Sequence, residues 1–120
     1  MKNLLYIMNQ APYSSNHDFE MLESAMVGAI FDLKINLLYR EEGVWSLISE
    51  QHGEQVNTRT YSKLLSALPT YEIDRVYFCK HSIQDRHINL KDLVPNASGL
   101  SLHEQKQLVA EQHIVMTGPK

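Results

Sequence analysis

Short apolar runs alternate with amphipathic segments along most of the chain. The runs have the length of a strand and end at polar residues, which is typical of central strands covered on both faces. They occupy residues 4–8, 35–39, 76–79 and 114–116. Strands that alternate with helices indicate a mostly parallel sheet. The pattern predicts one α/β domain over residues 1–120, a three-layer fold in which helices flank the sheet.

The segments between these runs predict helices. Residues 18–31 have helical periodicity, with a cap at Ser15 or Asn16, and they are apolar around much of the helix. Such a helix is either central to its own domain or packed against another subunit. Ser101 and Glu104 have the spacing of a capping box. The remaining helices are expected to begin after Gly43, at Thr58 (ending at Pro69), at Ser82 and at Ser101.

Composition and charge narrow the class of protein. Hydrophobic residues make up 43% and charged residues 21% of the chain, which suits an ordinary globular core. The net charge of −3, with no basic run, argues against direct binding of nucleic acid. The run 4–8 is too short for a signal core, and no stretch reaches the length of a membrane span. With one cysteine, we expect a cytoplasmic protein that does not associate with membranes.

Cys79 is the candidate for thiol or persulfide chemistry. It ends the third apolar run and precedes Lys80, His81 and the expected cap Ser82. A thiol near a helix N-terminus and beside cations has a lowered pKa, and the thiolate is the form that attacks a persulfide or disulfide. On this interpretation Cys79 is reachable by solvent at the carboxyl end of its strand. The alternative is a buried cysteine that only packs in the core.

Other sites have weaker signals. The six histidines do not have the paired spacing of a zinc site, so no metal is expected. No phosphate loop or dinucleotide fingerprint is present, so no cofactor is expected. Trp45 is interpreted as an exposed anchor for an interface. Because ligands gather at the carboxyl ends of parallel strands, the loops 9–17, 40–43 and 79–83 are the places to look for function.

The motifs, in order, resemble one known family. Their order and spacing are similar to the TusC/DsrF type of subunit in the DsrE/DsrF-like sulfur-relay family, and the resemblance covers nearly the whole chain. The matching segments are Ala11-Pro12-Tyr13, the small-residue helix 22–31, Glu42-Gly43-Val44-Trp45-Ser46-Leu47, Tyr71-Glu72-Ile73, Ser82-Ile83 and Leu90-Lys91-Asp92-Leu93-Val94.

The resemblance implies a DsrE/DsrF-like α/β fold and a place in a heterohexamer with TusB-like and TusD-like sibling subunits. In the TusBCD form, the complex accepts persulfide sulfur from a TusA-like donor and passes it to a TusE-like acceptor. The sulfur becomes the 2-thio group of wobble uridine in tRNA. Family knowledge assigns the essential sulfur-carrying cysteine to the TusD or DsrE subunit, so the resemblance gives Cys79 a matching position and not that role.

Three alternatives follow from the residues and the resemblance. The chain is an accessory and docking subunit of a sulfur relay, serving tRNA thiolation or, in the DsrEFH form, sulfur oxidation. Alternatively, Cys79 itself holds a persulfide. The third interpretation, from another class, is a stand-alone α/β domain that binds a small ligand.

Overall fold

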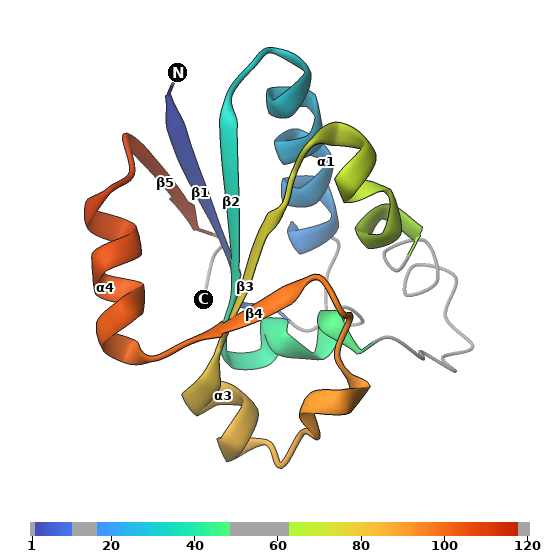
Figure 1. The fold of residues 1–120 in the computed structure, drawn as a ribbon, viewed down its shortest axis with the longest axis vertical. Coiled ribbons are helices and arrows are strands. Elements are labelled where there is room, and N and C mark those ends of the chain that lie inside the picture. Colours follow the sequence, from blue (N-terminus) through green and yellow to red (C-terminus); the bar gives the residue numbers. More distant parts are fainter. Residues whose placement is uncertain (1, 11–16, 49–62, 118–120) are drawn as a thin grey trace.

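The strands form one parallel sheet. A computed structural model describes residues 2–10, 17–48 and 63–117, and within these ranges five strands pair side by side. Their spatial order is β4-β3-β2-β1-β5, and every pair is parallel (Figure 1). This arrangement confirms the predicted α/β class. The strands are β1 (Asn3–Met8), β2 (Lys34–Tyr39), β3 (Arg75–Cys79), β4 (Ala97–Leu100) and β5 (Ile114–Thr117).

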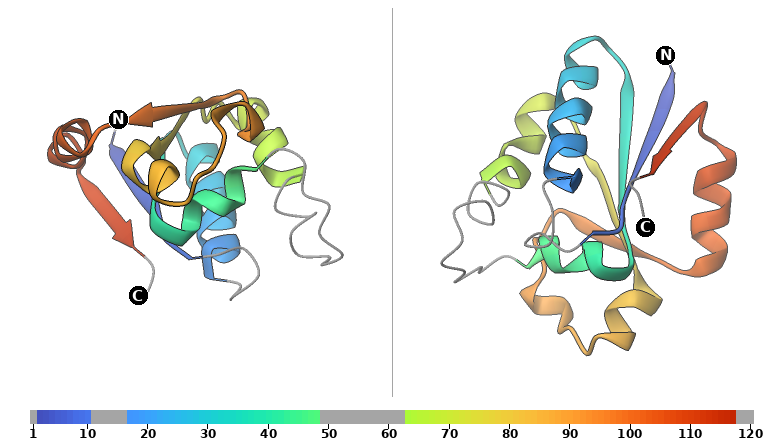
Figure 2. Two further views of the ribbon diagram at one scale, coloured as in Figure 1. Left: turned by 90° about the horizontal axis from the view of Figure 1, so that it is seen from below. Right: turned by 180° about the vertical axis from the view of Figure 1, so that it is seen from behind.

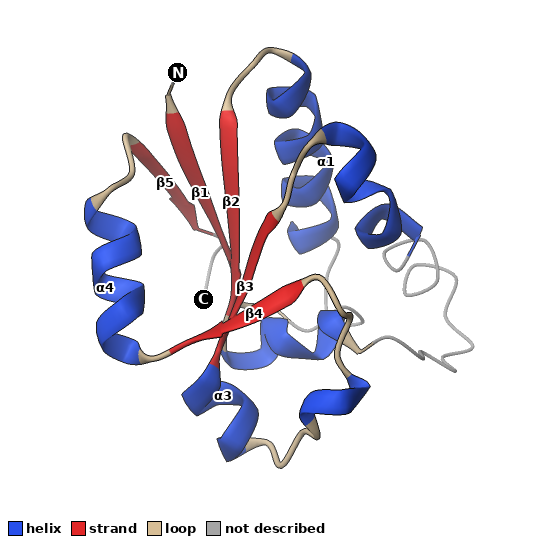
Figure 3. Cartoon of the chain, viewed as in Figure 1, coloured by secondary structure: helices blue, strands red, loops and turns tan. Residues whose placement is uncertain are grey.

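Helices cover both faces of this sheet, as Figures 2 and 3 show. The first helix packs against β1 and β2 on one face, together with a helical segment at 63–67. The last helix packs on the opposite face through Leu108. The three-layer fold is therefore present, with one layer much thinner than the other. The helices are α1 (His17–Ile30), α3 (Lys80–Asp85) and α4 (Leu102–Ala110), with three-ten helices η1 (Glu41–Leu47), η2 (Leu68–Tyr71) and η3 (Leu90–Asp92).

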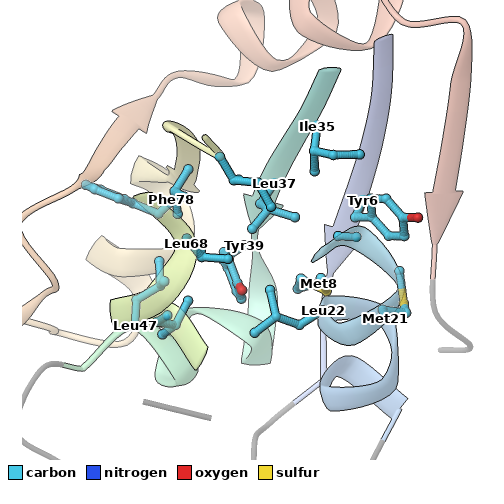
Figure 4. Close-up of a cluster of buried hydrophobic side chains, with 14 of the residues drawn as sticks. Tyr6, Met8, Met21, Leu22, Ile35, Leu37, Tyr39, Leu47, Leu68 and Phe78 are labelled. Carbon is cyan, nitrogen blue, oxygen red and sulfur yellow. The ribbon is translucent and has the colours of Figure 1, made fainter. Parts of the chain in front are cut away.

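Alternating side chains of the strands build two cores of unequal size. One residue of each neighbouring pair in β1 and β2 points to the α1 face, where it joins side chains of α1, η1 and η2 in a large buried cluster (Figure 4). The other residue of each pair points to the α4 face. That smaller cluster contains Leu5, Ile7, Leu38 and Leu108.

The turn after β2 depends on a glycine. A Cβ atom at Gly43 would overlap the carbonyl oxygen of Met8 and lie 3.1 Å from the Cα of Asn9. The same carbonyl accepts a hydrogen bond from the backbone N–H of Arg40 at 3.0 Å. Only a residue without a side chain lets η1 approach the end of β1 this closely. This close approach explains why a glycine stands in the Glu42-Gly43-Val44-Trp45 segment.

Several boundaries differ from the sequence predictions. β4 was not predicted, because Ala97-Ser98-Gly99-Leu100 contains no apolar run. The short helix after β3 begins at Lys80, and its N-cap is Cys79 instead of Ser82. η1 begins at Glu41, before Gly43. The expected caps Ser15, Asn16 and Thr58 lie outside the described residues.

Two further findings concern surfaces. Trp45 is half-buried in η1, so the interpretation of an exposed aromatic anchor was wrong for this chain. Among the helices of the described ranges, none has both the length and the apolar character that a membrane span requires.

Candidate functional site: a buried thiol at the carboxyl edge of the sheet

Cys79 lies at the junction of β3 and α3. As the last residue of β3 it has extended backbone, with φ −79° and ψ 116°, and its side chain then caps α3. The sulfur accepts a hydrogen bond from the backbone N–H of Ser82 at 3.4 Å. This satisfies one of the amides that a helix leaves free at its start. A thiol thus takes the position that serine or aspartate usually fills.

The thiol is enclosed by two other buried polar side chains. Cys79 is 3% exposed, and Ser82 and Gln105 are each 5% exposed. Gln105 belongs to α4, and its Nε2 also donates to the carbonyl oxygen of Leu100 at 3.2 Å. The expectation that solvent reaches Cys79 was therefore wrong for the chain alone. The reason is β4, whose continuation into α4 brings Gln105 against the sulfur.

Hydrogen bonds together outweigh burial in setting the pKa of the Cys79 thiol. Burial is the largest single influence and raises the pKa, because it disfavours the thiolate. The side chains of Ser82 and Gln105 and the backbone N–H groups of Ser82 and His81 all favour the thiolate by hydrogen bonding. Their combined effect lowers the pKa of Cys79 below its ordinary value. The lowered pKa was predicted, and one expected cause, the helix N-terminus, acts through the backbone N–H groups of His81 and Ser82. The other expected cause, neighbouring cations, is replaced by hydrogen bonds from the side chains of Ser82 and Gln105.

The basic side chains next to Cys79 in the sequence have other partners. The imidazole of His81 pairs with Asp85 at 3.3 Å, and both side chains are exposed. Lys80 is also exposed and acts on the carboxylate of Glu104. The influences on the sulfur come from hydrogen-bond donors and not from these charges. Adjacency in sequence was therefore a poor guide to which groups contact the thiol.

Ser82 connects the thiol to the turn after β2. Its hydroxyl oxygen accepts a hydrogen bond from the backbone N–H of Glu41 at 2.9 Å. Glu41 has a φ of 54°, a left-handed conformation that costs a residue with a side chain on the order of 1 kcal/mol. Arg86 strengthens the connection: it forms an ion pair with Glu42 at 2.8 Å and donates to the carbonyl oxygen of Ser82 at 3.2 Å. The loops 40–43 and 79–83, two of the three places where function was expected, are therefore in contact.

Gln105 is the site residue that sequence reasoning missed. It is twenty-six positions beyond Cys79, so no local motif joins the two. The available signal was its place in α4, three residues before the buried Leu108 on the same side of the helix. A glutamine on a buried helical stripe needs a hydrogen-bond partner. The sulfur of Cys79 and the carbonyl of Leu100 are those partners.

Within the described residues, no three histidine, cysteine, aspartate or glutamate side chains come together as a metal site. Two histidines have structural uses instead. His81 pairs with Asp85, and Nδ1 of His113 accepts a hydrogen bond from the backbone N–H of Asn3 at 2.9 Å.

The fold and the enclosed thiol define a small α/β protein with a buried cysteine of lowered pKa at the carboxyl edge of a parallel sheet. The chain belongs to the DsrE/DsrF-like family, whose model matches residues 2–117. This finding confirms the family indicated by the order of the sequence motifs.

Named relatives agree with this family. The chain is 30% identical over 94 residues to the intracellular sulfur oxidation protein DsrF of Allochromatium vinosum, covering 78% of this chain and 69% of that protein. It is 26% identical over 107 residues to a TusC homolog of Vibrio parahaemolyticus, covering 89% and 91%. A TusC homolog of Pseudomonas aeruginosa is 31% identical over 85 residues, covering 71% of each.

Two solved structures have the same fold. The crystal structure of the ychN protein from E. coli superimposes with a TM-score of 0.81 at 23% identity and covers 98% of this chain and 100% of that chain. A protein of unknown function from Methanobacterium thermoautotrophicum has a TM-score of 0.74 at 13% identity, with the same coverages.

Proposed function

We propose that this chain is an accessory subunit of a cytoplasmic sulfur-relay complex that passes persulfide sulfur for 2-thiolation of tRNA wobble uridine. Membership of the DsrE/DsrF-like family is the observation that supports this most strongly. Its partners would be TusB-like and TusD-like siblings in a heterohexamer, with a TusA-like donor and a TusE-like acceptor.

Coverage of the Vibrio relative favours the TusC type over the DsrF type, whereas the Pseudomonas TusC homolog is covered to 71%, close to DsrF. The match to the Vibrio TusC homolog extends over 91% of that protein, whereas the match to DsrF extends over 69%. The chain therefore corresponds to nearly a whole TusC homolog. The identity to DsrF, 30%, lies between the 26% and 31% of the two TusC homologs, so identity does not separate the two types and sulfur oxidation stays the second candidate.

The enclosure of Cys79 supports an accessory role. In persulfide transfer, a thiolate attacks the outer sulfur of the donor, a new S–S bond forms, and the donor leaves as a thiolate. That geometry needs an attacking sulfur in contact with the donor protein. Cys79 is 3% exposed beneath Gln105, so a donor cannot reach it while α4 is in place. We expect a sibling subunit to hold the sulfur.

The charge of the chain supports a role without direct contact to tRNA. The net charge is −3, and affinity for a phosphate backbone comes mainly from lysine and arginine. In fluorescence anisotropy at physiological salt, the chain alone should show no submicromolar affinity for substrate tRNA.

The test is the level of 2-thiouridine in tRNA of cells that make native chain, no chain, or Cys79→Ser. Loss of the chain should abolish the modification, because the relay complex is incomplete. Cys79→Ser should leave it largely intact, and Ser98→Ala, an exposed strand position, is the matched control. If Cys79→Ser removed 2-thiouridine while the siblings still co-purified, the cysteine would be a sulfur carrier.

The same cells distinguish the proposed function from the second candidate, a DsrF-type role in sulfur oxidation. If loss of the chain left 2-thiouridine unchanged but stopped the oxidation of stored or reduced sulfur, the DsrF-type function would replace the proposed one. If neither process changed and no sibling co-purified, a stand-alone ligand-binding domain would be the better interpretation.

A further inference from the structure

A hollow of about 330 Å³ lies at the carboxyl ends of β3 and β4. α3 and η3, which lie below β4 in Figure 1, enclose it together with the two strands. Its walls are apolar on most sides, and two polar side chains, Lys80 and Gln84, line it as well. Small-molecule sites have this size and character, and in parallel sheets they gather at the carboxyl ends of the strands. The large apolar lining residues are Phe78, Ile83, Ile88 and Leu90.

Gly99 of β4 keeps this hollow open. A Cβ atom there would lie 2.9 Å from the ring of Phe78 and 3.0 Å from Cγ of Lys80, and both of these residues line the hollow. Any larger residue would therefore push the two side chains into the space that they border. A glycine inside a strand often marks a place where another molecule approaches the backbone closely.

The opposite wall is fixed by the turn that joins α3 to η3. The backbone N–H of Ile88 donates to the carbonyl oxygen of Ile83 at 3.1 Å, which closes the end of α3. The side chain of Asn89 then caps η3 by accepting a hydrogen bond from the N–H of Lys91 at 3.3 Å. His87, between these bonds, has a φ of 53°, a left-handed conformation that is unfavourable for a residue with a side chain. The hollow is therefore a preformed feature of the fold.

Lys80 gives the mouth of the hollow a positive charge. Among the described residues that line the hollow it alone is charged, and its stem packs near Gly99 while the exposed ammonium group reaches water. No described carboxylate forms an ion pair with Lys80. Glu104 is influenced by Lys80 at longer range, but its carboxylate already accepts a hydrogen bond from the N–H of Ser101 at 2.9 Å. The ammonium group and the amide of Gln84 are thus available to an anion.

Two other hollows in the described part of the chain lack this combination. One, of about 190 Å³ at the amino ends of β2 and β3, is lined by Asp32, Glu72 and Asp74 beside Lys34. An anion there would meet more carboxylates than cations. The other, of about 310 Å³ beside Pro69, has no charged lining residue. The hollow beside β4 therefore differs from both, because it joins apolar walls to an unopposed cation.

We propose that the hollow beside β4 binds a small apolar molecule that carries one carboxylate. The apolar body of the ligand fills the space between the ring of Phe78 and the side chain of Leu90. Its carboxylate binds the ammonium group of Lys80 and accepts a hydrogen bond from the amide of Gln84. One lysine suits a single negative charge, since a further charge would lie without a partner against apolar walls.

This site is separate from the thiol. Phe78 and Lys80 flank Cys79 in the sequence, but Phe78 belongs to the buried cluster on the α1 face. The sulfur of Cys79 is hydrogen-bonded to Gln105 of α4 on the other face. The inference therefore does not rest on the proposed function, and a failed binding test would leave the 2-thiouridine test unaffected.

The first test is an NMR titration of the full chain with 4-methylpentanoate and with 3-phenylpropanoate, observed through the backbone amides. The acids should cause saturable shifts at millimolar concentration, centred on residues 78–90 and on Gly99. The neutral 4-methylpentanamide should bind about fivefold more weakly than its acid, because it lacks the charge that pairs with the exposed Lys80. Acetate, which has no apolar body, should cause no saturable shift. The proposal is overturned if neither acid causes a saturable shift, if the shifts centre elsewhere, or if the amide binds as tightly as the acid.

The second test repeats the titration with variants at exposed positions, whose folding is checked by thermal unfolding. Lys80→Met keeps the stem and removes the charge, so it should weaken binding of the acid about fivefold and leave binding of the amide unchanged. Leu90→Glu should abolish binding of both, because it places a carboxylate on the apolar wall. Ile30→Glu on α1 is the matched control: Ile30 is 65% exposed and Leu90 63%, but Ile30 does not line the hollow, so binding should stay native. Folded Lys80→Met or Leu90→Glu chains that bind the acid as the native chain does would overturn the proposal.

Discussion

The face of the sheet under α1 and the face under α4 are packed very differently. The α1 face has a continuous cluster drawn from three strands, α1, η1 and η2. The α4 face has three buried strand residues beneath a single buried leucine, Leu108, with only the half-buried Tyr77 and Leu100 packed against them. Fold stability therefore resides mainly on the α1 face. The thiol of Cys79 is hydrogen-bonded to Gln105 of α4, so it lies under the less strongly packed layer.

This difference teaches how one small domain can combine a fixed scaffold with a controllable thiol. Elements with few buried apolar contacts open locally at a lower free-energy cost than the global core. α4 is such an element, and it covers Cys79. We expect access to the sulfur to follow the opening of α4 while the α1 face stays folded.

The largest expected effect compares one leucine on each face. Leu22→Ala, at a fully buried position of α1, should lower the free energy of unfolding by about 4 kcal/mol. Leu108→Ala on α4 should lower it by about 2 kcal/mol, because fewer buried neighbours surround it. Urea unfolding measures both. Equal losses would show that the two faces contribute equally to stability.

A glycine on the α1 side gives the next largest effect. Gly43→Ala should destabilise the chain by about 3 kcal/mol, because the new methyl group overlaps the Met8 carbonyl and forces η1 away from β1. Gly28→Ala in α1 is the control, since its Cβ would meet only side-chain atoms at 3.4 Å. The control should be neutral or slightly stabilising. Thermal unfolding that ranks the two variants the other way would refute the close approach at Gly43.

A smaller effect sharpens the link between α4 and the thiol. Ser101 and Glu104 form both bonds of a capping box, at 3.1 Å and 2.9 Å. Ser101→Ala should cost about 1 kcal/mol and loosen the start of α4. The alkylation rate of Cys79 should rise with it, whereas the destabilising Gly43→Ala should change that rate less per kcal/mol. Unchanged alkylation in Ser101→Ala would separate α4 from access to the thiol.

The sequence predicted most of the scaffold because its signals are local. Apolar runs identified β1, β2, β3 and β5, helical periodicity identified α1, and Ser101 with Glu104 identified the start of α4. β4 was missed because its strand conformation comes from pairing with β3 and not from its own residues. The N-cap of α3 was also assigned to the wrong residue, Ser82 instead of Cys79, because cysteine is an uncommon N-cap residue.

The candidate site was predicted only in part, for the same reason. Cys79 and its lowered pKa could be anticipated from the strand end and the following helix. The enclosure by Gln105 could not, because it depends on how the chain continues from β4 into α4. Contacts between residues distant in sequence decide whether a thiol is exposed or covered.

The most direct test is the alkylation rate of Cys79 in the native chain, measured as a function of pH. It shows whether α4 covers the thiol and lowers its pKa. The native rate should be far below that of the unfolded chain. Since the folded pKa is lowered, the rate should level off at a pH below the ordinary thiol value of about 8.5. Gln105→Ala should raise the alkylation rate of Cys79, and it should also raise the pH at the midpoint of the rate profile. Substitution of the exposed Gln107 with alanine should change neither quantity. A native thiol that reacts as fast as the unfolded one, or a midpoint at or above about 8.5 that Gln105→Ala leaves in place, would contradict a thiol held beneath α4.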